Sequence, residues 1–109
     1  MNVQRGDAEE WADWFQAISD PTRILILHLL AISGRPLTVG EITEAVDVGQ
    51  STVSHHLKKL GEVRFVLVDH IGTASYYRFN DLCFECFPSA AQLIVGGAVP
   101  SEFVEVIGA

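Results

Sequence analysis

Apolar residues recur with the period of an α-helix through the first third of the chain. Between residues 8 and 18 they lie at i, i+4 and i+7, which predicts an amphipathic helix with one apolar stripe. The stripe consists of Trp11, Phe15 and Ile18. Residues 22–32 are apolar almost all round, so this second predicted helix is expected to form the buried axis of the domain. Asp20 is a natural N-cap for it, and Pro21 suits its first position.

Two shorter helices joined by a tight turn are predicted next. Thr38 can cap the first of them, and Glu41, three residues later, completes a capping box. A turn over residues 47–49 leads into the second helix, whose apolar residues recur at i, i+4 and i+7 and are expected to face the core. These are Val53, Leu57 and Leu60. The polar residues Ser51, Ser54, His55 and Lys58 then face outward, with Gln50 at the tip.

A helix pair whose second member is polar on its outer face is the arrangement of a helix-turn-helix DNA reader. Hydroxyl, amide, histidine and lysine side chains can hydrogen-bond to base edges and phosphates in a major groove. Residues 65–79 alternate with period two and have Gly72 in the connection, which predicts a β-hairpin. The predicted fold class is therefore mainly α with a small β-hairpin, a winged helix-turn-helix.

The segment after the hairpin is predicted to return to helix. Asn80 and Asp81 signal a helix start, but Pro88 disfavours helical geometry at the residue before it. We therefore expect a short turn over residues 82–86 and then a last helix over about residues 88–98.

The composition indicates one domain that associates with another copy. At 109 residues the chain, 1–109, forms a single domain, because a second core would leave both too small. Hydrophobic residues make up 49% and mean hydropathy is +0.27, more apolar surface than so small a core can hide. No apolar run approaches the ~18 residues of a membrane span, and the N-terminus lacks a signal-peptide core, so no membrane is expected. Two closely spaced cysteines do not make a disulfide framework, which favours the reducing cytoplasm.

The net charge of −7 opposes binding to a polyanion, but the acidic residues are unevenly distributed. Eight of the 14 lie near the two ends of the chain, at residues 7–20 and 85–105, and residues 50–59 contain none. That segment instead carries His55, His56, Lys58 and Lys59. A locally basic face on an acidic body is compatible with DNA binding and predicts modest non-specific affinity.

Three segments, DPTR at 20–23, QSTVSHHLKKL at 50–60 and YYRF at 76–79, strongly resemble the ArsR/SmtB family of winged-helix metalloregulatory repressors. The resemblance covers about residues 10–80. It implies a homodimer built from the first and last helices, binding to a double-stranded DNA operator without inducer, and release when a metal, metalloid or oxidant is sensed. It also implies a recognition helix that carries Gln50, Ser51, Thr52, Ser54, His55 and Lys58.

The sequence departs from the family pattern at three places. Many arsenic sensors of the family have a cysteine pair where Thr38 and Gly40 stand here, so that site is absent. The zinc-type site on the family's last helix needs a histidine, which this helix lacks. The arginines usual in the wing are replaced by Leu67, Asp69, His70 and Thr73. We therefore expect weak wing contacts to phosphate, although Arg64 and Arg78 flank the wing.

Cys83 and Cys86, just before the last predicted helix, are the remaining candidates for an inducer site. Two thiols at i and i+3 on a helical turn point the same way and can share one soft ion. The alternative is that both are small apolar residues packed in a Phe-rich interface, since free cysteine is often buried. A dithiol offers zinc only two of its four ligands but satisfies trivalent arsenic or its methylated form. Cd(II), Zn(II) and oxidation to a disulfide or polysulfide stay open, and no permanently bound cofactor is expected.

The leading hypothesis is a repressor that senses As(III) or another soft ion through this dithiol. The alternatives are a thiol redox or sulfide sensor that uses the same pair, and a ligand-independent winged-helix module that binds protein. An enzyme is not expected, because no acid–base constellation is visible. His28 and His56 are expected to be structural, whereas His70 either meets DNA or is solvated. The expected dimer interface consists of Trp11, Phe15 and Ile18 with Leu93, Ile94 and Val95.

Overall fold

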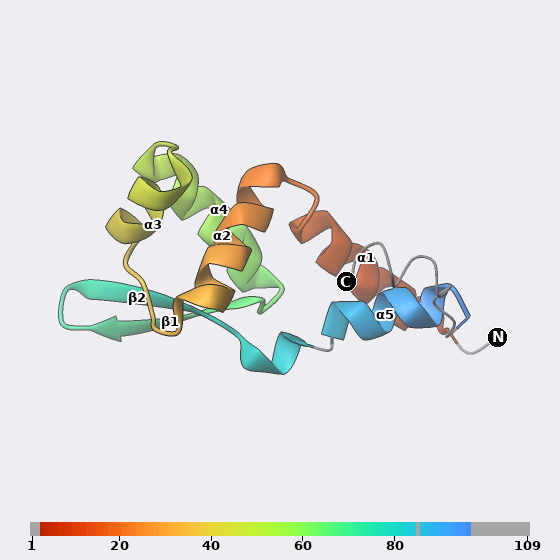
Figure 1. Ribbon diagram of the computed structural model, residues 1–109. Coiled ribbons are helices and arrows are strands. Elements are labelled where there is room, and N and C mark those ends of the chain that lie inside the picture. The colour runs from red at the N-terminus through yellow and green to blue at the C-terminus, as the bar shows by residue number, and fades with distance from the viewer. Residues whose placement is uncertain (1–2, 85, 97–109) are drawn as a thin grey trace.

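The protein consists of helices and one β-hairpin, and its first and last described helices are in contact (Figure 1). The computed structural model describes the backbone of residues 3–84 and 86–96, and the side chains of these residues except 83, 84 and 86. The elements are α1 (Arg5–Ala17), α2 (Pro21–Ser33), α3 (Val39–Val46), α4 (Gln50–Glu62), β1 (Val66–Ile71), β2 (Ala74–Phe79), the 3-10 helix η1 (Asp81–Phe84) and α5 (Cys86–Ile94). The predicted winged helix-turn-helix is confirmed.

The ends of the first two helices follow from local hydrogen bonds. α1 begins three residues earlier than predicted, where the backbone N–H of Gln4 donates to Asp7 Oδ2 at 3.3 Å. α2 begins as predicted, because Asp20 Oδ1 accepts from the backbone N–H groups of Thr22 (2.8 Å) and Arg23 (3.2 Å). It ends at Gly34, whose φ of 72° is the left-handed conformation that glycine adopts without strain.

The core lies where α2, α3, α4 and the hairpin meet. Its buried residues are Ala17, Ile26, Leu30, Leu37, Ile42, Val53, Leu57, Leu60, Phe65 and Val66. The predicted inward stripe of α4 is therefore confirmed. Phe65 extends this core toward the helices at the chain ends, because its ring centroid lies 6.3 Å from that of Trp14 and 5.8 Å from that of Phe87.

α2 is not the fully buried axis that its sequence predicted. Ile26 and Leu30 face the core, but Ile24, Leu25 and Ile32 are more than half exposed. α2 packs on α3, α4 and β2, and these neighbours cover only part of its surface (Figure 1). An all-apolar helix thus presents a bare apolar face in the single chain.

β1 and β2 form a two-stranded antiparallel hairpin, which we call the wing (residues 66–79). The register runs from Val66 opposite Phe79 to Ile71 opposite Ala74, and Gly72 in the connection has φ of 62°. An isolated bridge between Leu37 and Tyr77, with two N–H···O bonds of 2.8 Å, fastens the wing to the loop before α3. The wing extends away from α1 and α5 (Figure 1).

The last helix begins at Cys86, two residues before the predicted start at Pro88. The prediction was wrong because Pro88 is only the third residue of α5. The first four N–H groups of a helix have no intrahelical partner, so proline costs no hydrogen bond there. The predicted turn over 82–86 is instead η1 at Asp81–Phe84, and residues 97–98 of the predicted helix lie outside the described residues. In the described part of the chain, no single helix is long and apolar enough to cross a membrane.

Candidate nucleic-acid interface

α4 separates its residues into a buried stripe and an exposed polar face. Its first turn follows a tight connection in which Asp47 adopts the left-handed conformation (φ 54°) and Gly49 is the N-cap. The three residues predicted to point inward are at most 2% exposed. The six predicted DNA-contacting residues are all exposed on the same helix: Gln50, Ser51, Thr52, Ser54, His55 and Lys58. The structure therefore brings these six side chains together on the outer surface of one rigid element.

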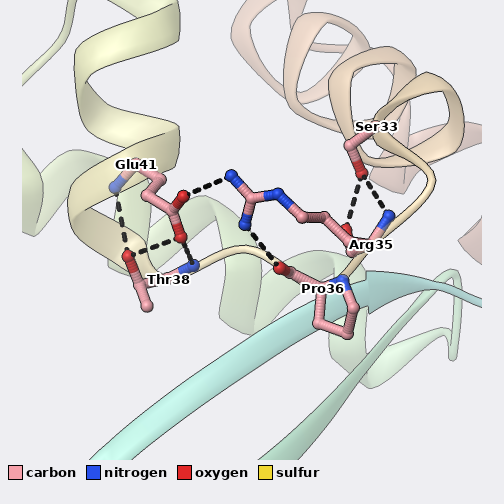
Figure 2. A network of polar contacts seen from close by, with 5 residues as sticks. All are labelled: Ser33, Arg35, Pro36, Thr38 and Glu41. Carbon is pink, nitrogen blue, oxygen red and sulfur yellow. Dashed lines mark hydrogen bonds and ion pairs between the residues drawn. The ribbon is translucent and has the colours of Figure 1, made fainter.

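A polar network fixes the start of α3, the helix that supports α4 (Figure 2). Thr38 Oγ1 accepts from the backbone N–H of Glu41 at 3.2 Å, and Glu41 Oε1 accepts from the N–H of Thr38 at 3.1 Å. The predicted capping box is confirmed. Arg35 adds an ion pair from the loop after α2, with Nη2 2.6 Å from Glu41 Oε2. The network thus ties the end of α2 to the first turn of α3.

This network also sets the ionisation of its members. The hydrogen bond from Arg35, reinforced by the N–H of Thr38, lowers the pKa of Glu41 to about 2. Glu41 in turn raises the pKa of Arg35. Arg35 is exposed but already paired with Glu41, so its charge is partly neutralised before any phosphate approaches.

His56 contacts the start of α2 from the flank of α4, as its expected structural role requires. Its Nε2 lies 3.8 Å from Asp20 Oδ1, and its side chain is only 12% exposed. Among the described residues, no group hydrogen-bonds to the buried Nδ1. The backbone N–H of Arg23 is the main cause that lowers the pKa of Asp20, and His56 contributes to it. Neighbouring His55 instead belongs to the outer face.

The cationic residues of the wing and of the end of α4 are mostly paired. Arg78 Nε lies 3.2 Å from Asp69 Oδ2 within the wing. Lys59 Nζ lies 3.9 Å from Glu62 Oε2 on α4. Lys58 makes no ion pair within the described part of the chain. Lys58 is thus the cation on the outer face of α4 that remains available for a phosphate.

A cleft of about 430 Å³ separates α4 from the wing. It is lined by Ser54, Leu57, Lys58, Gly61, Glu62, Val66, Val68 and Tyr77. Sequence reasoning identified Ser54 and Lys58 but missed Val68 and Tyr77. The alternation of the wing signals which residues share a face, but not which face turns toward α4.

The two cysteines occupy two different elements. Cys83 is the third residue of η1, and Cys86 is the first residue of α5, so they are not on one continuous helical turn as predicted. Their side chains lie outside the described residues. Among the residues whose side chains are described, no group of three or more His, Cys, Asp or Glu is placed to hold a metal ion.

An apolar hollow of about 520 Å³, which sequence reasoning did not identify, lies beside the start of α5. Its lining is Ile18, Ile24, Leu27, His28, Ala31, Phe79, Phe87 and Pro88. On the α2 side, the hollow is lined by the apolar face of that helix. The sequence pattern alone had predicted that this face is buried in the core. The hollow therefore marks where a neighbour could cover α2.

The residues predicted to form a dimer interface gather at one end of the molecule. α1 and α5 are in contact there (Figure 1). Trp11, Phe15 and Ile18 are half-buried within the single chain. Leu93, Ile94 and Val95 are 51%, 55% and 62% exposed. The end of α5 and the residue after it thus present three exposed apolar side chains.

Comparison with known proteins gives the family. The model of the family described as bacterial regulatory protein, arsR family, matches residues 20–67. The transcriptional repressor SdpR of Bacillus subtilis (strain 168) is 39% identical over 66 residues, which cover 61% of this chain and 71% of SdpR. The chain belongs to the ArsR family. The family consists of DNA-binding transcriptional regulators, so the expectation of a regulator rather than an enzyme is confirmed.

Two further relatives of this ArsR-family protein bear on its mechanism. The arsenical resistance operon repressor of Bacillus subtilis (strain 168) is 37% identical over 67 residues, 62% of this chain and 63% of that repressor. The homodimeric winged helix-turn-helix DNA-binding domain Mb0332 of Mycobacterium bovis, a possible ArsR-family regulator, superposes with a TM-score of 0.66. It is 27% identical, and the match covers 87% of this chain and 90% of that domain.

Proposed function

We propose that this ArsR-family protein is a homodimeric repressor that binds a double-stranded DNA operator with the outer face of α4. One observation carries the proposal: all six polar residues of that face are exposed, and the opposite stripe is buried. Such a helix can enter a major groove without disturbing the core that holds it. Lys58 supplies a phosphate contact, and Ser54 and His55 supply hydrogen-bonding groups for base edges.

The homodimer is supported by the exposed apolar side chains of α5. Leu93, Ile94 and Val95 are exposed at the end of α5, a helix that is in contact with α1, so apolar side chains from this end can pair with those of a second copy. A relative of the same fold is homodimeric. Two copies related by a two-fold axis would present two α4 helices to two half-sites of a pseudo-palindromic operator.

We assign the inducer site to Cys83 and Cys86, with a trivalent arsenical as ligand. The support is the position of the pair at the junction between the wing and α5, and a relative that represses an arsenical resistance operon. Binding of arsenous acid, As(OH)3, forms two As–S bonds and breaks two As–OH bonds. Each displaced hydroxide leaves with one thiol proton as water. An ion that links η1 to α5 would change the orientation of α4 and the wing relative to α5, the proposed dimer helix. To lower DNA affinity about 5- to 150-fold, it needs a coupling free energy of ~1–3 kcal/mol.

Other ligands of the same two thiols are distinguished by the same experiment. Wild-type protein bound to the duplex it selects from a random library is treated separately with arsenite, methylarsenite, Cd(II), Zn(II) and a thiol oxidant. We expect arsenite to release the DNA from the wild type but not from the Cys83→Ser, Cys86→Ser variant, whose DNA affinity should be unchanged. Release of the double variant by arsenite would place the site elsewhere. Release of the wild type by oxidant but not by arsenite would establish a redox or sulfide sensor instead.

A further inference from the structure

Arg23 carries a charge that no other group pairs with in the described part of the chain. It is the third residue of α2, and its backbone N–H donates to Asp20 Oδ1 at 3.2 Å. Its side chain is half-buried, and no described group hydrogen-bonds to the buried Nε. Asp20 uses the same Oδ1 to cap α2 and forms no ion pair with the guanidinium. A cation in the first turn also faces the positive end of the helix dipole. Because a buried charged donor without a partner is costly, this guanidinium favours binding of an anion.

Arg23 lines a pocket of about 360 Å³ between α1, α2 and the end of α4. The other lining residues are Asp13, Gln16, Ala17, Lys59, Glu62 and Val63. Lys59 Nζ and Glu62 Oε2 lie 3.9 Å apart, so these two charges largely offset each other. Asp13 forms no ion pair within the described residues, either with Arg23 or with another cation. The pocket therefore holds one unpaired cation and one unpaired carboxylate that do not reach each other.

The lining of this pocket suits a small molecule that carries both charges. Its two acids and two bases sum to zero (−2 and +2), so it does not attract a polyanion such as DNA. The planar fork of a guanidinium matches a carboxylate through two parallel hydrogen bonds. An ammonium group in turn matches the free carboxylate of Asp13. The volume falls within the range of small-molecule sites, roughly 300–1,000 Å³.

We propose that this pocket binds a free α-amino acid, whose carboxylate contacts Arg23 and whose ammonium group contacts Asp13. Ala17 and Val63 offer methyl groups to the side chain of the ligand, which favours a short apolar side chain such as that of valine. The site uses none of the residues that we assign to the inducer, to DNA or to the dimer interface. The inference therefore goes beyond the proposed function and does not depend on it. The bound ligand joins α1 to the end of α4.

Isothermal titration calorimetry of the full chain tests this charge pattern with matched ligands. L-valine is compared with isovalerate, which lacks the amino group, and with isobutylamine, which lacks the carboxylate. We expect each analogue to bind at least about tenfold more weakly than valine, as for loss of one charge-assisted contact. Equal affinities for valine and isovalerate, or tighter binding of inorganic phosphate, would overturn the proposal. So would the absence of binding by valine and by every other standard L-amino acid.

Variants at the two charged residues test whether the ligand lies in this pocket. Asp13→Asn and Arg23→Lys should each weaken valine binding at least about tenfold, because asparagine lacks the charge and lysine cannot form two parallel hydrogen bonds. Asp13→Asn should also lose the preference for valine over isovalerate, which a general loss of stability would not produce. The matched control is Glu10→Gln, which removes an exposed carboxylate one turn earlier on α1 and should bind valine as the wild type does. Wild-type affinity in Asp13→Asn, or an equal loss in Glu10→Gln, would overturn the site.

Discussion

Arg35 Nη2 lies 2.6 Å from Glu41 Oε2, and this ion pair joins the loop after α2 to the first turn of α3. The same carboxylate accepts from the N–H of Thr38, so one side chain serves both as helix cap and as partner of the loop. α3 stands between α2 and α4 in the chain and packs on both. The pair therefore helps to set the orientation of the helix that we propose reads DNA.

Glu41→Gln should lower the Tm at pH 7, because it removes the charged partner of Arg35. The pKa of Glu41 falls from 4.5 to about 2 on folding. Its contribution to the free energy of unfolding is therefore fully present above about pH 4.5. That contribution is lost as the pH falls toward 2, and the difference in Tm between variant and wild type should shrink over this window. Thermal unfolding followed by circular dichroism at several pH values measures it.

Glu9→Gln provides the matched control for this prediction. Glu9 pairs with Arg5 at 3.2 Å, but both side chains are far more exposed (68% and 90%). Exposed pairs of this kind contribute little to stability. Equal effects of Glu41→Gln and Glu9→Gln at pH 7 would show that the Arg35–Glu41 pair does not stabilise the helix-turn-helix.

Dimerisation is expected to depend on the apolar surface of α5. Light scattering should give the wild type a mass of twice the 11.9 kDa of one chain. Leu93→Asp combined with Ile94→Asp should give a folded monomer, because two buried charges cannot be paired across a two-fold interface. Leu82→Asp, at a side chain that is 85% exposed on η1, should remain dimeric. A folded wild-type monomer at micromolar concentration would contradict the interface.

Lys58 and Lys59 are adjacent lysines with different predicted roles. Lys58→Ala should weaken binding to all DNA sequences and reduce the salt slope by about one per subunit, as for loss of one phosphate contact. Lys59→Ala should change the slope less, because Lys59 lies near Glu62. Titrations over a range of NaCl concentrations measure both, and equal slopes for the two variants would refute the distinction.

The helix-turn-helix could be predicted from sequence because its signals are local. The capping box of Thr38 and Glu41, the turn before Gly49 and the i, i+4, i+7 stripe of α4 all lie within a few residues of one another. The wing could also be predicted from sequence, because apolar and polar residues alternate along its strands on both sides of one glycine. Most backbone hydrogen bonds of these elements are formed within the element itself, so their formation depends little on the rest of the structure.

Features that depend on neighbours were predicted less well. The periodicity of α2 could not show that its neighbours leave Ile24 and Ile32 exposed. The rule that the residue before proline avoids helix failed at Phe87, which is helical and packs on Phe65 with ring centroids 5.8 Å apart. The pairing of Arg35 with Glu41 and of His56 with Asp20 joins separate elements, and no spacing in the sequence signals it.

Binding of the selected duplex by a Ser54→Ala, His55→Ala, Lys58→Ala variant tests the role of α4 most directly. The control is Gln16→Ala, at an exposed polar residue of α1 that belongs neither to α4 nor to the proposed dimer residues. We expect the first variant to lose sequence-specific binding and keep its circular dichroism spectrum, and the control to bind as the wild type. Unchanged affinity of the first variant for the selected duplex would contradict the assignment of α4 as the DNA-reading helix.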